Sequence, residues 1–73
     1  DMDKMTRKSQ EAMQAASQYA EKQGHPSVES EHLLWALVQQ TEGIVPRLIE
    51  KSGGNAKILS EELKYKFEKI HSN

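Results

Sequence analysis

This 73-residue sequence has no cysteine, no excess of charge of either sign and no long apolar run. Without cysteine the chain forms neither disulfides nor thiolate metal sites. The 10 basic and 11 acidic residues leave a net charge of −1, which offers no electrostatic footprint for nucleic acid or an anionic membrane. No apolar run approaches the roughly 18 residues of a membrane span, and the polar N-terminus lacks a signal-peptide core. The sequence therefore predicts a cytoplasmic protein that binds neither nucleic acid nor membrane.

Motifs for catalysis and metal binding are also missing. There is no Gly-x-Ser-x-Gly elbow, and no Gly-Lys-Ser/Thr follows Gly53-Gly54 as a phosphate-binding loop requires. His25 and His32 could in principle converge on a metal with the glutamates near them, but the HExxH and Cys/His spacings are absent. A hydrogen-bonding role for His32 near a helix start is favoured instead. We predict no metal, no cofactor and no enzymatic activity in this chain.

The residues that are present favour short amphipathic helices, and the most apolar of these covers about 31–41. At 100° per residue, four of its aliphatic side chains share an arc of about 140° that we predict to face the core: Leu33, Leu34, Leu37 and Val38. Ser30 is predicted to cap the start of this helix, and Gly43 to give the chain a left-handed exit after it. Trp35 falls outside the arc.

A first helix is predicted over about 7–23, with Thr6 as its N-cap and Gly24 at its end. Its apolar face consists mostly of small side chains: Ala12, Ala16, Tyr19 and Ala20. Small side chains allow a second helix to approach closely. Met13 lies at the edge of this face.

Two further helices are predicted after Gly43, over about 44–52 and 56–70. Gly53-Gly54 is predicted to end the first of them, and Asn55 to cap the second. The apolar arc of the shorter helix holds Ile44, Val45, Leu48 and Ile49. The longer helix has a narrow apolar stripe at Ala56, Leu59, Leu63, Phe67 and Ile70. No segment alternates with a period of two, so we predict an all-α fold of four short helices without a sheet.

Three apolar side chains lie off these faces. Ile58 and Tyr65 are one heptad apart on the far side of the last helix, and Trp35 is off the main arc of its own helix. Scattered apolar residues are normal on protein surfaces, whereas a cluster of them marks a contact surface. Both interpretations stay open at this point.

Several short blocks follow one another in a characteristic order along the chain. They are Met5-Thr6-Arg7-Lys8-Ser9-Gln10-Glu11-Ala12, Gly24-His25, Glu31-His32-Leu33-Leu34-Trp35-Ala36-Leu37 with Val28 before it, Gly43-Ile44-Val45-Pro46-Arg47-Leu48-Ile49 and Glu61-Glu62-Leu63. In this order they resemble the first repeat of the Clp N-terminal domain of bacterial AAA+ unfoldases, most closely of the ClpB-like disaggregases. The resemblance covers nearly all of the chain.

This resemblance implies that residues 1–73 form a single four-helix repeat, which is half of the usual two-repeat, eight-helix domain. It also implies a non-catalytic module that binds exposed apolar segments of unfolded or aggregated client proteins and passes them to hexameric rings. The ATP of the family is bound in those rings, outside this chain.

Residues for client binding follow from the resemblance and from the helix faces. Thr6 and Glu31 match family positions at helix starts that contribute to substrate recognition, although an N-cap and a helix-dipole partner would explain both residues without a ligand. We predict an apolar groove lined by Met5, Met13, Tyr19 and Trp35, with Thr6 and Glu31 at its rim. Methionine suits such a groove because its side chain is flexible and polarisable.

A second hypothesis is a stand-alone or ClpC-type adaptor domain that docks to other helical proteins. In the family, the second repeat covers a face that this chain would leave open. A homodimer would cover that face symmetrically, with Trp35, Ile58 and Tyr65 as interface candidates.

Overall fold

Four helices make up the part of the chain that the computed structural model describes, which is the backbone of residues 4–71 and the side chains of 6–69. They are α1 (Lys4–Lys22), α2 (Ser30–Gln39), α3 (Ile44–Lys51) and α4 (Ala56–His71), with no strand among these residues. The predicted all-α fold of four helices with short loops is confirmed. None of the described helices is long and apolar enough to cross a membrane.

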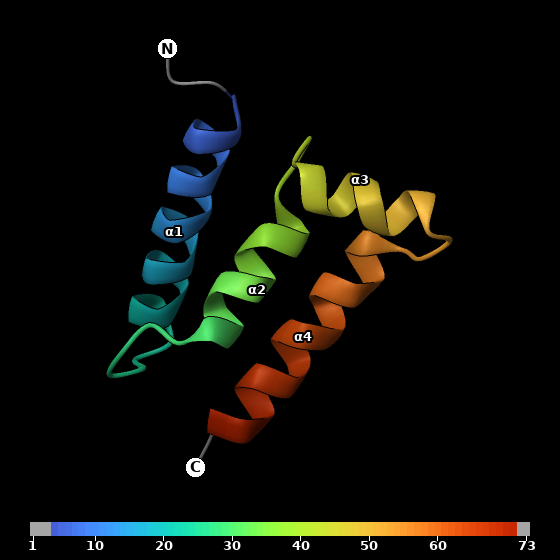
Figure 1. The fold of residues 1–73 in the computed structure, drawn as a ribbon. Coiled ribbons are helices and arrows are strands. Elements are labelled where there is room, and N and C mark those ends of the chain that lie inside the picture. Colours follow the sequence, from blue (N-terminus) through green and yellow to red (C-terminus); the bar gives the residue numbers. More distant parts are fainter. Residues whose placement is uncertain (1–3, 72–73) are drawn as a thin grey trace.

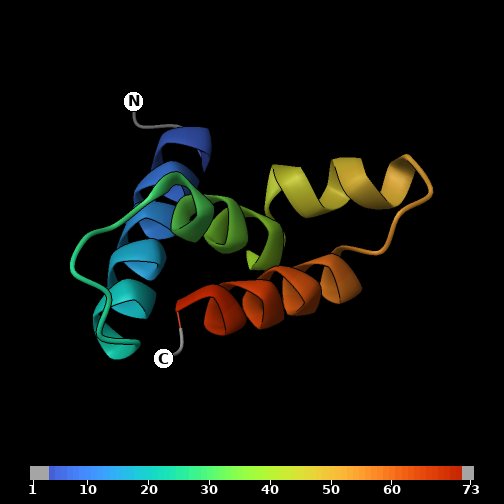
Figure 2. The same cartoon turned by 90° about the horizontal axis from the view of Figure 1, so that it is seen from below.

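The helices form a thin plate with α2 at its centre (Figure 1). Helices α1 and α2 run antiparallel, α4 packs on the other side of α2, and α3 joins the upper ends of α2 and α4. The view along the plate in Figure 2 shows this arrangement from below. The Cα extents are 41 × 31 × 15 Å, and 15 Å leaves room for no more than two layers of helices at the usual axis spacing of about 8–10 Å. So thin a plate leaves apolar side chains exposed on its faces.

Glycine ends α1 and α3, as the sequence predicts. Gly24 is left-handed at φ 76°, and the His25 N–H donates to the Ala20 carbonyl at 2.9 Å while the Gly24 N–H donates to Glu21. This is the Schellman arrangement, in which a residue without a Cβ reverses the chain at no steric cost. Gly53, at φ 94°, ends α3 in the same way.

The helix starts were predicted less well. Asn55 caps α4 as expected, because its Oδ1 accepts the Ile58 N–H at 2.9 Å. Thr6 is not a cap, since the helix formers before it carry α1 back to Lys4 and place Thr6 within the first turn. Ser30 is already helical, and the extended Glu29 is the N-cap of α2.

The turn between α2 and α3 also differs from the expectation. Gly43 is not left-handed, having φ −82°, and it serves as the N-cap of α3, while Glu42 takes the left-handed conformation at φ 59°. Position 43 requires glycine for a different reason, because any side chain there would crowd the side chain of Gln40. A Cβ there would lie 2.9 Å from Gln40 Oε1 and 3.2 Å from Gln40 Cβ.

The core is centred on alanines where α1 crosses α2. Ala12, Ala16 and Ala36 are at most 1% exposed and pack together, so the predicted small-residue face of α1 is confirmed. The absence of longer side chains lets the two helices approach closely. Tyr19 and Ala20 are buried on the same face of α1.

The predicted core arc of α2 is confirmed except at Leu34, since Val38 is buried and Leu33 and Leu37 pack against the alanine core. Leu33 and Leu37 are half-buried there, whereas Leu34 is 47% exposed. The fully buried residues are His32 and Ala36. Because α2 packs on α1 with its His32–Ala36 side, the Leu34 edge of the arc is turned toward a face of the plate that no helix covers completely.

Helices α3 and α4 also have apolar side chains that no neighbouring helix covers. Helix α3 buries none of its residues, and Ile44 and Leu48 from its predicted arc are 54% and 57% exposed. On α4, Ala56 and Phe67 are buried as predicted, whereas Leu59 is exposed. The side chain of Ile70, the last residue predicted for this stripe, lies outside the described residues.

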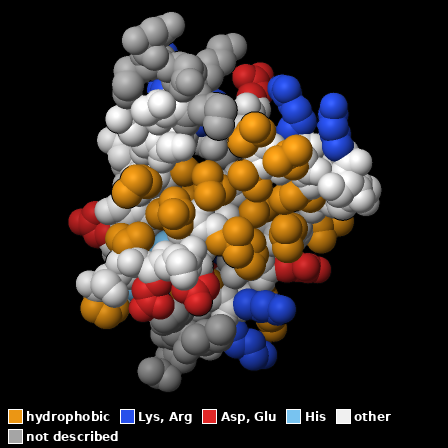
Figure 3. All heavy atoms as spheres, viewed as in Figure 1, with side chains coloured by type: hydrophobic (Ala, Val, Ile, Leu, Met, Phe, Trp, Pro, Cys, Tyr) orange, Lys and Arg blue, Asp and Glu red, His pale blue; other side chains and the backbone are white. Residues whose placement is uncertain are grey.

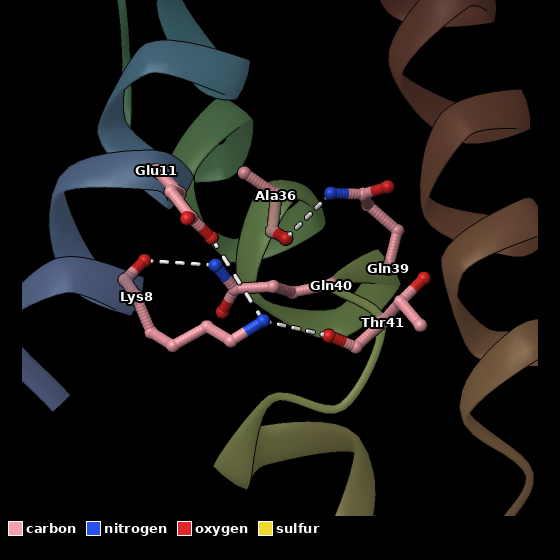
Figure 4. A network of polar contacts seen from close by, with 6 residues as sticks. All are labelled: Lys8, Glu11, Ala36, Gln39, Gln40 and Thr41. Atoms are coloured by element: carbon pink, nitrogen blue, oxygen red, sulfur yellow. Dashed lines mark hydrogen bonds and ion pairs between the residues drawn. The ribbon is translucent and has the colours of Figure 1, made fainter. Parts of the chain in front are cut away.

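A polar clamp ties the start of α1 to the α2–α3 turn (Figure 4). The nearly buried Gln40 donates through Nε2 to the Lys8 carbonyl at 2.8 Å. In return, Lys8 Nζ donates to the Thr41 carbonyl at 2.9 Å and lies 3.8 Å from Glu11 Oε1. The clamp holds the end of the α1–α2 hairpin that lies opposite its connecting loop.

Candidate protein-interaction surface

Five rings meet where α1, α2 and α4 converge, near the α1–α2 loop. Tyr19 stacks on Trp35 with ring centroids 4.5 Å apart at an interplanar angle of 25°, and Phe67 lies 5.9 Å from Tyr19. Phe67 also lies 4.2 Å from the ring of His32 and 5.4 Å from that of His25. This aromatic cluster of Tyr19, His25, His32, Trp35 and Phe67 fastens α4 to the α1–α2 hairpin.

The Tyr19 hydroxyl is the polar tip of the cluster. It donates to Glu68 Oε2 at 3.4 Å, which links α1 directly to α4. Burial, followed by the nearby Glu68 charge and by this hydrogen bond, raises the pKa of Tyr19 to about 12 from an ordinary value of 10.0. The folded chain thus keeps a proton that the unfolded chain loses at lower pH.

Alkaline pH is expected to destabilise the domain through Tyr19. A raised folded pKa gives stability that is complete below pH 10 and is lost as the pH rises from 10 to about 12. The melting temperature of the wild type should therefore fall more steeply above pH 10 than that of Tyr19→Phe, as measured by circular dichroism. Tyr65→Phe, at an exposed tyrosine, should follow the wild type. Parallel profiles for the wild type and Tyr19→Phe would contradict the expectation.

His25 and His32 are brought together, although not as a metal site. His25 Nδ1 lies 2.8 Å from His32 Nε2, and His32 Nδ1 accepts the Glu29 N–H at 2.8 Å. No three His, Cys, Asp or Glu side chains among the described residues could hold a metal ion. The sequence places one histidine directly after a helix-ending glycine and the other in the first turn of the next helix, and that spacing is the sequence feature from which the pair could have been expected.

The residues predicted to line a binding groove are only partly brought together. Tyr19 and Trp35 stack on each other, so Tyr19 is buried and Trp35 is half-buried inside the fold. Met13 is 64% exposed on α1. The side chain of Met5 lies outside the described residues.

The two residues predicted at the groove's rim lie far apart. Thr6 is exposed near the start of α1, and Glu31 is exposed in the first turn of α2, where its charge complements the helix dipole. Because the two helices are antiparallel, these positions lie at opposite ends of the hairpin (Figure 1). Tyr19 of α1 lies beside His32, the neighbour of Glu31, and thirteen residues, or about 20 Å of helix, separate Tyr19 from Thr6. Thr6 and Glu31 do not border one groove.

The residues predicted for an interface differ in exposure. Ile58 and Tyr65 are exposed on the outer side of α4, where they line a shallow hollow together with Glu61, Glu62 and Lys66. Trp35 is half-buried against Tyr19 and presents only part of its ring to solvent.

A broad exposed apolar surface extends over α2, α3 and α4 (Figure 3). We call it the α2–α4 surface and define it by the large exposed side chains of these helices other than those on the outer side of α4: Leu34, Ile44, Leu48 and Leu59. Figure 3 shows hydrophobic side chains gathered over the middle of the plate, with charged groups toward its margins. Contiguous exposed apolar area of this kind is typical of a surface that contacts another protein.

Residues 4–73 match the family model for the Clp repeat (R) N-terminal domain. The chain belongs to this family. Membership agrees with the four-helix fold, and it makes the chain a non-catalytic domain, because the match covers all the described residues. The Clp N-terminal resemblance predicted from the sequence blocks is confirmed.

Curated relatives of this Clp N-terminal domain are named Chaperone protein ClpB. The one from Bdellovibrio bacteriovorus is 58% identical over 66 residues, which are 90% of this chain and 8% of the relative. Those from Nitratidesulfovibrio vulgaris and Clostridium tetani are 43% and 36% identical, covering 86% and 88% of this chain and 7% of each relative. The chain thus spans less than a tenth of the length of these relatives. No solved structure matches it.

Proposed function

We propose that this chain is the client-binding N-terminal module of a ClpB-like chaperone in the cytoplasm, which holds exposed apolar segments of non-native proteins for hexameric, ATP-driven rings. The observation that carries the proposal is the α2–α4 surface. Its members come from three helices, and at α3 the exposed side chains are those of the apolar arc itself.

The shape of this surface supports a client rather than a single fixed ligand. The plate is thin, and its apolar side chains are spread over three helices instead of lining a deep pocket. Apolar contact is non-directional, so a broad surface of this kind accepts segments of varied sequence. Curated relatives named as chaperones agree with this choice of partner.

Replacing Ile44 and Leu48 together with glutamine is expected to weaken client binding about ten-fold or more. Both side chains are more than half exposed, so the fold should tolerate the change, while a bound apolar segment loses about 1 kcal/mol of contact at each position. The measurement is fluorescence anisotropy of labelled, reduced and carboxymethylated α-lactalbumin titrated with each variant.

Met13→Gln is the matched control, because Met13 is equally exposed but lies on α1, in the groove predicted from the sequence. Undiminished binding by this variant supports the α2–α4 surface. Weaker binding by Met13→Gln alone would move the site to that groove. Equal affinity in all three proteins, or no binding by the wild type, would overturn the proposed function.

Self-association is the second candidate, and one observation favours it: Ile58 and Tyr65 are exposed one heptad apart on the outer side of α4. A homodimer through this side would bury both residues twice across a two-fold axis. Light scattering of the wild type and of Ile58→Gln over a range of concentrations decides this. A dimer that Ile58→Gln dissociates supports self-association, and a monomer at every concentration excludes it.

A further inference from the structure

His32 is the largest fully buried side chain among the described residues, and it is held by two directed hydrogen bonds. Its Nδ1 accepts the Glu29 N–H at the start of α2, and its Nε2 lies 2.8 Å from His25 Nδ1 in the α1–α2 loop. The pair therefore connects the loop to the first turn of α2. This network has no part in the proposed client binding.

The direction of the first bond fixes the proton positions in both rings. A backbone N–H can only donate, so His32 Nδ1 carries no proton and the proton of the neutral ring is on Nε2. That proton is donated to His25 Nδ1, which must also be bare. The reverse order, with His25 as the donor, would need a proton on His32 Nδ1, where the Glu29 N–H already points.

The pair is packed against the elements that it holds together. Phe67 of α4 lies 4.2 Å from the His32 ring, and Tyr19 of α1 approaches that ring edge-on at 6.0 Å. Tyr19 is thus a titratable group that faces the pair from α1, and its hydroxyl donates to Glu68 of α4. Glu29 faces the pair through its backbone N–H.

We propose that His25 and His32 form an acid-labile latch that holds the α1–α2 loop and the Phe67 end of α4 on α2. A proton added to either Nδ1 breaks one of the two hydrogen bonds and sets two N–H groups against each other. In the unfolded chain these two hydrogen bonds do not exist, so a proton on either ring breaks nothing there, and acid favours the unfolded chain. Opening the latch loosens the aromatic cluster that contains Trp35.

Thermal unfolding of the 73-residue chain at pH 7.5 and pH 5.0 tests the latch, followed by circular dichroism and by Trp35 fluorescence. Loss of one buried hydrogen bond in a domain of this size corresponds to a fall in melting temperature of about 5–10 °C. Asparagine at 25 places an acceptor oxygen where His25 has Nδ1 and cannot be protonated, so His25→Asn should lose less than half as much between the two pH values.

Lys8→Met is the matched control. It weakens the polar clamp at the opposite end of the hairpin, so it should lower the melting temperature by a similar amount at both pH values. Equal acid losses in the wild type and His25→Asn, or no acid loss in the wild type, would overturn the proposal. Imidazole nitrogen NMR at pH 7.5 gives an independent test in the wild type alone: a proton on His32 Nε2 supports the latch, and a proton on Nδ1 overturns it.

Discussion

Replacing Phe67 with alanine is expected to lower the free energy of unfolding by about 3–5 kcal/mol. Phe67 is buried on α4 and contacts the rings of Tyr19, His25 and His32, so its removal leaves a cavity that three neighbours border and that cannot collapse easily. A domain of 73 residues has a total stability of only about 4–11 kcal/mol. The variant should be close to unfolding at room temperature, which urea denaturation followed by circular dichroism measures.

Tyr65→Ala is the control on the same helix, because it removes a larger ring from an exposed position two residues away. Its free energy of unfolding should stay within about 0.5 kcal/mol of the wild type. Similar losses in the two variants would mean that helix propensity, and not the aromatic cluster, governs the stability of α4. A loss at Phe67 below about 1 kcal/mol would mean that α4 is held to α2 by other contacts.

Local chemistry explains why the helix ends after Gly24 and Gly53 and the Asn55 cap could be predicted from the sequence. Each depends on one residue and its neighbours in the chain, and needs no knowledge of the fold. The starts of α1 and α2 could not be predicted as well. At Ser30 a good capping residue lies beside Glu29, and the choice between them is made by His32, which takes the Glu29 N–H for its own ring.

Packing between helices was predictable only where one face had a single partner. The alanine face of α1 meets α2 alone at its centre, and it was predicted correctly. Helix α2 has neighbours on two sides, so its buried side is set by how α1 and α4 flank it. Counting apolar residues placed Leu34 inside and did not predict the full burial of His32, because the energy of a buried histidine depends on partners from other segments. The same limit applies to α3, whose apolar arc leaves Ile44 and Leu48 exposed instead of burying them in a core.

The candidate site shows this limit most clearly. The family resemblance and the helix faces together suggested a groove with Thr6 and Glu31 at its rim, yet the antiparallel hairpin places them at its opposite ends. The stacking of Tyr19 on Trp35 likewise depends on how α1 and α2 are aligned along each other, and that alignment cannot be derived from the sequence of either helix alone. Exposure of the α2–α4 surface depends on the thickness of the whole plate.

Replacing Ala16 with leucine should test that register directly, with an expected loss of about 2–3 kcal/mol. Ala16 is 1% exposed and packs against Ala36 where α1 and α2 are closest, so three added carbon atoms have no free volume to enter. The helices must separate, which strains the Tyr19–Trp35 stack on one side and the Gln40–Lys8 clamp on the other. A fall in melting temperature of about 10 °C is expected.

Ser17→Leu makes a comparable addition at the next residue, where the side chain is exposed, and it should leave the melting temperature nearly unchanged. If Ala16→Leu is tolerated as well as Ser17→Leu, the two helices are not in close contact at the alanines. The aromatic cluster would then have to position α1 by itself, and Phe67→Ala should release α1 as well as α4. Trp35 packs against the alanines and also stacks on Tyr19, so the alanine contact and the aromatic cluster are coupled. The loss measured by denaturation of the Ala16→Leu, Phe67→Ala double variant should therefore differ from the sum of the two single losses.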